Sequence, residues 1–189
     1  MALGWHYTTD LKSLRWRCGY CGRSVGGNVG YRREESCDES KAVYICPYCE
    51  NPTAFVAGEF GGYGQYPAPV MGEDVEHVPQ IVRNLYDEAR RCVQYTAHTS
   101  AVLSLRKLLM NVAVNLGAPE NQGFRAYVDY LNEEGYIPPN GKCWVEALKD
   151  KGNEAAHEIA PMSKEDAIML LDFAEMLLKF VYEFPARMK

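Results

Sequence analysis

The sequence predicts a mainly α-helical protein, in which a bundle of about five helices follows a small β-structured segment. Two observations predict this class. After about residue 75, apolar residues recur every three or four positions, which is the period of an amphipathic helix. Before about residue 60, cysteine, glycine and aromatic residues are frequent and short β-like runs occur, SLRWRC, AVYIC and PTAFVAG. We therefore expect three parts: residues 1–60, a Gly/Pro-rich linker over 61–74, and a helical bundle over 75–189.

The helical part has recognisable start and stop signals. Apolar periodicity predicts helices over about residues 79–95, 100–116, 122–134, 144–160 and 163–184. Gly117 suits the position after the second helix, because glycine readily adopts the left-handed conformation that commonly ends a helix. The hydroxyl of Ser163 can cap the last helix, with Asp166 in its first turn. The apolar face of this last helix is wide enough to lie at the centre of a bundle.

The composition argues against several classes of protein. The 189 residues carry a net charge of −5, with 20 Lys and Arg against 25 Asp and Glu, which disfavours a broad phosphate-binding surface. No apolar run reaches the roughly 18 residues of a membrane span, and the N-terminus lacks the apolar core of a signal peptide. We therefore expect a cytoplasmic protein without a membrane partner, whose cysteines stay reduced.

Four of the seven cysteines form two C-x-x-C pairs, Cys18 with Cys21 and Cys46 with Cys49. Zinc prefers four ligands in a tetrahedron, and each C-x-x-C turn supplies two thiolates. An apolar or aromatic strand leads into each turn, and the 24 residues between the pairs are enough for a β-hairpin. The spacing therefore predicts a zinc ribbon, in which these four cysteines hold a structural Zn²⁺.

The cysteines have other interpretations. A redox-active dithiol is normally a single C-x-x-C at the start of a helix, so two pairs within 32 residues disfavour it. Cys37 can in principle replace one ligand, but it has no partner at the C-x-x-C spacing. Cys92 and Cys143 lie on apolar helical faces and are most simply small core residues.

The surface of the ribbon also has two interpretations. Tyr20 and Tyr48 offer stacking faces to nucleic acid, and the arginines at positions 23, 32 and 33 offer phosphate contacts. The acidic side chains at positions 34, 35, 38 and 39 lie beside those arginines and would largely cancel their charge. The alternative is a module that stabilises a small fold or docks on a partner.

A concentrated set of reactive polar groups lies in the segment KDKGNEAAHE of the fourth expected helix. Asn153 and His157 are four residues apart and therefore share a helix face, with Lys151 within side-chain reach. A histidine can act as general acid or base, a cation can stabilise charge on a phosphate, and an amide can orient the reacting group. These three roles suffice for metal-independent RNA cleavage by the 2′-hydroxyl. The alternative is that His157 is a helix histidine that hydrogen-bonds within the bundle.

From about residue 78 to 184, the sequence resembles domain of unknown function 4145, a branch of the HEPN superfamily. The resemblance rests on IVRNLYDEA, SAVLSLRKLL, GNEAAH and SKEDAIMLLDFAEMLLKFVYE. It implies a HEPN-like helical bundle that forms a homodimer, with a zinc-ribbon-like segment as a frequent companion. Many HEPN domains are metal-independent ribonucleases with an R-x4-6-H motif. By resemblance, His157 matches the histidine of that motif, Asn153 matches a family asparagine, and Lys151 stands where the arginine is expected.

This sequence departs from the family pattern at two places. Lys151 keeps the positive charge but lacks the planar guanidinium that grips phosphate. Arg106 matches a family arginine on the second helix, but Met110 stands where an acidic residue is frequent. We therefore expect a non-catalytic binding module of a prokaryotic or phage system, with a protein or nucleic-acid partner. The alternative is a metal-independent HEPN-type endoribonuclease that uses Lys151, Asn153 and His157.

Overall fold

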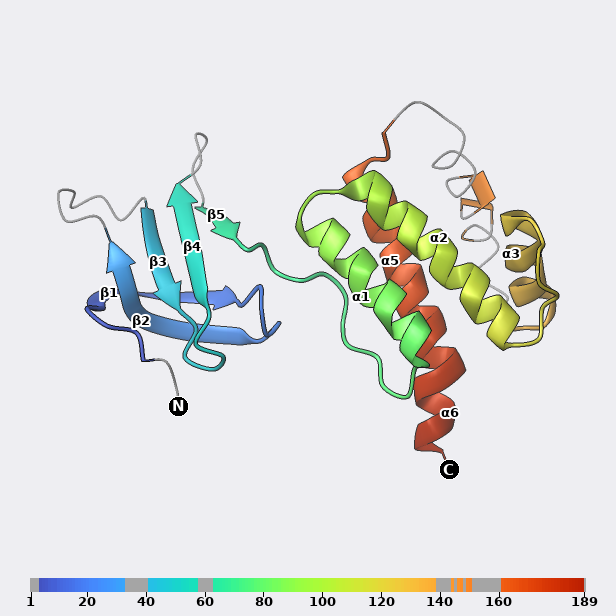
Figure 1. Ribbon diagram of the computed structural model, residues 1–189, viewed down its shortest axis with the longest axis horizontal. Coiled ribbons are helices and arrows are strands. Elements are labelled where there is room, and N and C mark those ends of the chain that lie inside the picture. Colours follow the sequence, from blue (N-terminus) through green and yellow to red (C-terminus); the bar gives the residue numbers. More distant parts are fainter. Residues whose placement is uncertain are drawn as a thin grey trace. The chain divides into compact units, whose positions relative to one another are not determined.

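The computed structural model describes residues 4–32, 41–57, 63–138, 144, 146–147, 149–150 and 161–188. The chain divides into two units, Met1–Val70 and Met71–Lys189, and each has its own buried core. The described strands all belong to the first unit and the described helices to the second (Figure 1). We call them the sheet unit and the helical unit.

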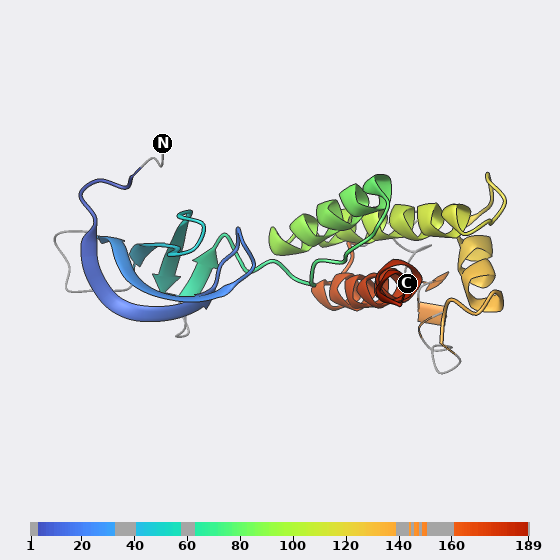
Figure 2. The ribbon, with the colours of Figure 1, turned by 90° about the horizontal axis from the view of Figure 1, so that it is seen from below.

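The described part of the sheet unit forms one antiparallel sheet of five strands, whose order in space follows their order in the sequence. The strands are β1 (Thr9–Arg17), β2 (Ser24–Arg32), β3 (Lys41–Ile45), β4 (Pro52–Ala57) and β5 (Tyr63–Tyr66). The first two are long and strongly curved (Figure 2). In β2, a Cβ atom on Gly30 would overlap the carbonyl oxygen of Val43 in β3, so this position requires glycine.

Three aromatic side chains form most of the sheet core. Trp16, Tyr44 and Phe55 come from β1, β3 and β4 and are each about 6% exposed. Their ring centroids lie 5.5 to 5.9 Å apart in edge-on or tilted arrangements, the geometry that aromatic quadrupoles favour. The buried thiols of Cys18 and Cys46 belong to the same small cluster. The sheet core is therefore continuous with the predicted metal site.

The helical unit is built from four longer helices among the described residues. They are α1 (Gln80–Gln94), α2 (His98–Asn115), α3 (Phe124–Glu133) and α5 (Lys164–Leu178), and the last continues through the π-helical turn η2 (Lys179–Glu183) into α6 (Phe184–Arg187). α2 packs against α1, α3 and α5, and α5 also packs against α1. The fully buried side chains of this core include Leu105 and Leu108 from α2 and Leu171 and Phe173 from α5.

The predicted helix signals at Ser163 and Gly117 are confirmed. The hydroxyl of Ser163 accepts the N–H of Asp166 at 3.0 Å, and the Asp166 carboxylate accepts the backbone N–H of Ser163 at 3.4 Å. These are the two reciprocal bonds of a capping box at the start of α5. Gly117 follows α2 with a φ of 108°, a backbone conformation that side chains disfavour.

Residues 71–76 lie against α1, where Arg90 binds them. Its nearly buried guanidinium donates to the carbonyl oxygens of Met71 at 2.9 Å and Gly72 at 3.0 Å. The same group forms an ion pair with Asp74 at 2.6 Å. Because one side chain satisfies several groups of the 71–76 segment, this segment is part of the folded helical unit.

Carboxylates on α5 and η2 bind the 71–76 segment as well. Glu175 accepts the backbone N–H of Glu73 at 2.9 Å, and the buried Glu183 accepts that of Glu76 at 3.0 Å. Lys179 forms ion pairs with both Glu73 and Glu175, at 2.8 and 2.7 Å. The start of the unit and its last helix are thus joined through charged hydrogen bonds.

The expectation of a mainly α-helical protein is wrong. The sheet unit is a five-stranded antiparallel sheet, which is a larger share of β structure than the sequence predicted, so the fold is mixed. Two of its strands, β2 with the sequence SVGGNVGYR and β5 in the Gly/Pro-rich stretch 61–74, have compositions that disfavour strands. They pair because neighbouring strands supply their hydrogen-bond partners.

Candidate metal centre

The two C-x-x-C pairs form equivalent turns at the same end of the sheet. One turn connects β1 to β2 and the other connects β3 to β4. In both, the carbonyl oxygen of the first cysteine accepts the N–H of the residue four positions later, at 2.9 Å. Those residues, Gly22 and Glu50, both have a left-handed backbone, with φ of 69° and 58°. The turns therefore share one backbone geometry, although only the first has a glycine at that position.

The four sulfur atoms lie close together, within 4.8 Å of one another. The Sγ atoms of Cys18 and Cys49 are 3.7 Å apart, and those of Cys21 and Cys46 are 3.9 Å apart. A tetrahedron of sulfurs about 2.3 Å from a metal ion has edges of about 3.8 Å, whereas a disulfide bond measures about 2.0 Å. The spacing of the sulfurs therefore fits a tetrahedral metal ion and excludes disulfides.

The environments of the four thiols differ. Cys18 and Cys46 are fully buried, whereas Cys21 and Cys49 are partly exposed. Burial raises the pKa of Cys18 to about 12 and also raises the pKa of Cys21. Burial acts in the same direction on Cys49, but hydrogen bonds with Asn51, and then with the thiols of Cys46 and Cys18, outweigh it and lower the pKa of Cys49 to about 7.

Buried thiols of this kind favour a bound cation. Bringing four thiolates together in a small core is unfavourable unless a positive ion compensates their charge. Backbone N–H groups already point at the sulfurs: that of Tyr20 lies 3.4 Å from the Sγ of Cys18. Four thiolate ligands close the coordination shell, which suits a structural role and leaves no position for a reacting water molecule.

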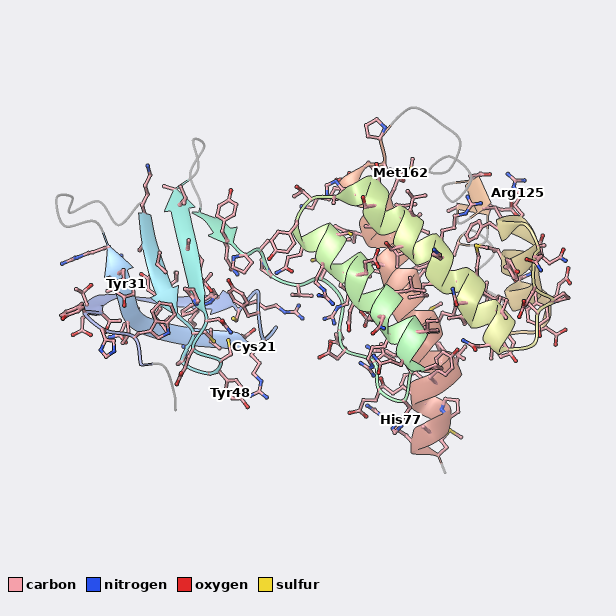
Figure 3. The ribbon with its side chains drawn as sticks, in the orientation of Figure 1. Cys21, Tyr31, Tyr48, His77, Arg125 and Met162 are labelled. Carbon is pink, nitrogen blue, oxygen red and sulfur yellow. The ribbon has the colours of Figure 1, made fainter. Side chains whose placement is uncertain are left out.

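The tyrosines of the two turns lie at the surface, as do the arginines near them. Tyr20 is 50% exposed and Tyr48 is 60% exposed. The guanidinium carbon of Arg23 lies 3.3 Å from the ring centroid of Tyr48, so the planar group of one turn stacks on the ring of the other. Tyr48 and Cys21 are labelled together at one end of the sheet unit, away from Tyr31 (Figure 3).

The other predicted site lies outside the described residues. Lys151, Asn153 and His157 all fall in the range 151–160, as do the groups that flank them. Cys37 and Cys143 also lie outside the described part of the chain.

Arg106, the arginine on α2 that matches a family arginine, is among the residues that the structure describes. Arg106 lies over the ring of Phe124 with its guanidinium carbon 4.7 Å from the centroid, and burial lowers its pKa. Arg106 therefore packs on an aromatic ring of α3. Cys92, predicted as a core residue, is partly buried on α1 and packs against the helical core.

Comparison with known proteins identifies the family of this chain. None of the described helices is long and apolar enough to cross a membrane. No curated protein and no solved structure matches the chain. The family model of the domain of unknown function DUF4145 matches residues 87–189, which is more than half of the chain and lies within the helical unit. The chain therefore belongs to the DUF4145 family.

Proposed function

We propose that this protein is a non-catalytic binding module whose sheet unit is a zinc ribbon, stabilised by a structural Zn²⁺. The spacing of the four cysteine sulfurs carries the proposal, because it matches the edge of a tetrahedral tetrathiolate site. Four thiolates select zinc or iron among the common metals, and zinc is the usual ion in closed structural sites.

The metal would supply stability that the sheet core does not provide alone. The buried apolar cluster of the sheet unit consists of Trp16, Ala42, Tyr44, Phe55 and two of the ligand cysteines. A core of this size buries little surface, and small domains of this kind usually depend on a metal or on disulfides. The surface left around the metal is then free to bind a partner.

The helical unit has features that support a homodimer in the same proposal. Phe180 and Phe184 contact each other edge to face at 5.4 Å, yet they are 51% and 40% exposed. Met188, which directly follows α6, is also exposed. A second copy of the chain would bury these side chains, which agrees with the dimer that the resemblance to HEPN domains implies.

A second candidate is a metal-independent HEPN-type endoribonuclease. The match to the family covers the segment that contains Lys151, Asn153 and His157, which is the observation in its favour. In this candidate His157 transfers protons, Lys151 stabilises negative charge on the phosphorus centre, and Asn153 orients the substrate. The lysine in place of arginine disfavours it, because an ammonium cannot hold phosphate in a bidentate manner.

One experiment separates the two candidates. Purified protein and His157→Ala would be incubated with a panel of labelled RNAs in a chelator, and circular dichroism would show whether each sample stays folded. A binding module leaves every RNA intact in both samples. Cleavage by the wild type that disappears in His157→Ala, with cyclic phosphate ends, would contradict the proposal and assign a nuclease.

A further inference from the structure

We propose that the cysteine end of the sheet unit binds single-stranded nucleic acid, an inference that rests on the proposed metal-stabilised binding module. Tyr20 and Tyr48 occupy the same position of their turns, the third residue of CGYC and of CPYC. Because the two turns share one backbone geometry, they present two exposed rings at one end of the sheet. Exposed aromatic faces of this kind stack on unpaired bases.

Arginines lie beside both rings. Arg23 stacks on the ring of Tyr48 at 3.3 Å and remains exposed. The Nε of Arg17 donates to the carbonyl oxygen of Gly22 at 2.9 Å, which holds this exposed side chain at the first turn. Arg15 lies two residues earlier in β1 and is also exposed. The rings are therefore accompanied by guanidinium groups, which bind phosphate and stack on bases.

Positive charge predominates among the described residues of the sheet unit, although the chain as a whole is acidic. Its described residues include six Lys and Arg but only two Asp and Glu. The remaining acidic residues of the unit fall in the ranges 33–40 and 58–62, outside the described residues. Of the six described cations, Arg15, Arg17 and Arg23 lie in or beside the first cysteine turn, whereas Arg32 and Lys41 lie at the opposite strand ends. Among the described acidic residues of the unit, Glu50 lies beside the cysteine turns and Asp10 lies near the start of β1.

The combination of rings and positive charge favours a single strand over the other partners. In a duplex the bases are already stacked and cannot lie on tyrosine rings. Tyrosine and arginine are also common at protein interfaces, but six cationic against two acidic described residues in this unit suit a phosphate backbone. Bases and phosphates alternate along a single strand, so it can contact the rings and the arginines at the same time.

The test is fluorescence anisotropy of the full chain, with its metal bound, against labelled oligouridylate, oligothymidylate and a short duplex. We expect the wild type to bind the single strands more tightly than the duplex. Binding of both oligouridylate and oligothymidylate would indicate recognition by stacking and phosphate contacts, and binding of oligouridylate alone would add recognition of the 2′-hydroxyl. With three arginines at phosphates, affinity should fall roughly 20-fold between 50 and 200 mM salt.

The variants test the residues that carry the inference. Tyr20→Ser combined with Tyr48→Ser should weaken binding at least about tenfold, because each base stack contributes substantially. Arg23→Gln should weaken binding and reduce the slope of log affinity against log salt by about 0.7. The matched controls are Tyr7→Ser, an exposed tyrosine before β1, and Arg91→Gln, an exposed arginine of the helical unit, and neither should change affinity.

Two results would overturn the inference: no binding by wild-type protein that contains its metal, or equal affinities for the wild type and the double tyrosine variant. Metal content, measured on the same samples, separates this failure from failure of the proposed function. Protein that contains zinc but binds no nucleic acid remains a binding module and would then have a protein partner. Protein without metal would refute the zinc ribbon itself.

Discussion

At the scale of single residues, the cysteines of each pair are not equivalent. The first cysteine of each turn is fully buried and continuous with the aromatic core, whereas the second is partly exposed. Cys46, for example, accepts a turn hydrogen bond through its carbonyl oxygen and also borders the sheet core. Loss of a buried cysteine should therefore affect both the metal and the packing of the sheet.

We expect Cys46→Ser to weaken binding of zinc or cobalt more than about 100-fold, because loss of a direct ligand should cost more than loss of an outer-shell contact. The visible absorption of the cobalt-substituted protein would report the number of thiolate ligands. Cys92→Ser is the matched control, since Cys92 lies in the helical unit, and its cobalt spectrum should equal that of the wild type. An unchanged spectrum for Cys46→Ser would show that this thiol is not a ligand.

Ser163 allows a second prediction at this scale. Ser163→Ala removes the acceptor for the Asp166 N–H and should lower the free energy of unfolding of the helical unit by about 1 kcal/mol. Ser163→Thr keeps the hydroxyl that accepts from the Asp166 N–H and donates to the Asp166 carboxylate, and it should lose much less. Urea unfolding followed by circular dichroism would measure both, and an equal loss in the two variants would show that the cap contributes nothing.

At the scale of elements, the 71–76 segment depends on Arg90. Arg90→Met leaves the carbonyl oxygens of Met71 and Gly72 without their donor and should cost about 3 kcal/mol of the free energy of unfolding. The neighbouring Arg91 is exposed on the same helix, so Arg91→Met should change stability by less than about 0.5 kcal/mol. Thermal unfolding would compare the two, and similar losses would contradict a specific role for Arg90.

The helices were the elements best predicted from the sequence. α1, α2 and α3 begin and end within about two residues of the expected positions, because each has a clear apolar period and a local stop signal such as Gly117. The expected last helix is interrupted by the π-helical turn η2, which periodicity does not reveal. Beyond it, Pro185 lacks the N–H that would bond to the carbonyl oxygen of Val181 in a regular α-helix.

The strands were predicted less well, and the reason is tertiary. The three glycines of β2 disfavour a strand locally, yet Gly30 is required by its close approach to Val43, and a side chain on Gly27 would press on the ring of Trp16. Such contacts join residues far apart in the sequence, so local propensity cannot show them. The convergence of the four cysteines followed from their spacing alone.

At the scale of the whole molecule, the two units have separate cores, and the predicted metal lies in one of them. We expect a chelator to abolish the near-ultraviolet circular dichroism of the sheet aromatics while the helical far-ultraviolet signal persists. Readdition of zinc should restore the sheet signal. Loss of both signals together would show that the helical unit depends on the metal, and loss of neither would show that the sheet folds without it.

Metal content tests the central claim most directly. Inductively coupled plasma mass spectrometry would be applied to protein purified without added metal, together with native mass spectrometry of the same sample. The tetrathiolate geometry predicts one zinc ion per chain, which disappears when Cys18, Cys21, Cys46 and Cys49 are replaced by serine. A folded chain that contains no metal, or that contains iron in place of zinc, would contradict the zinc ribbon.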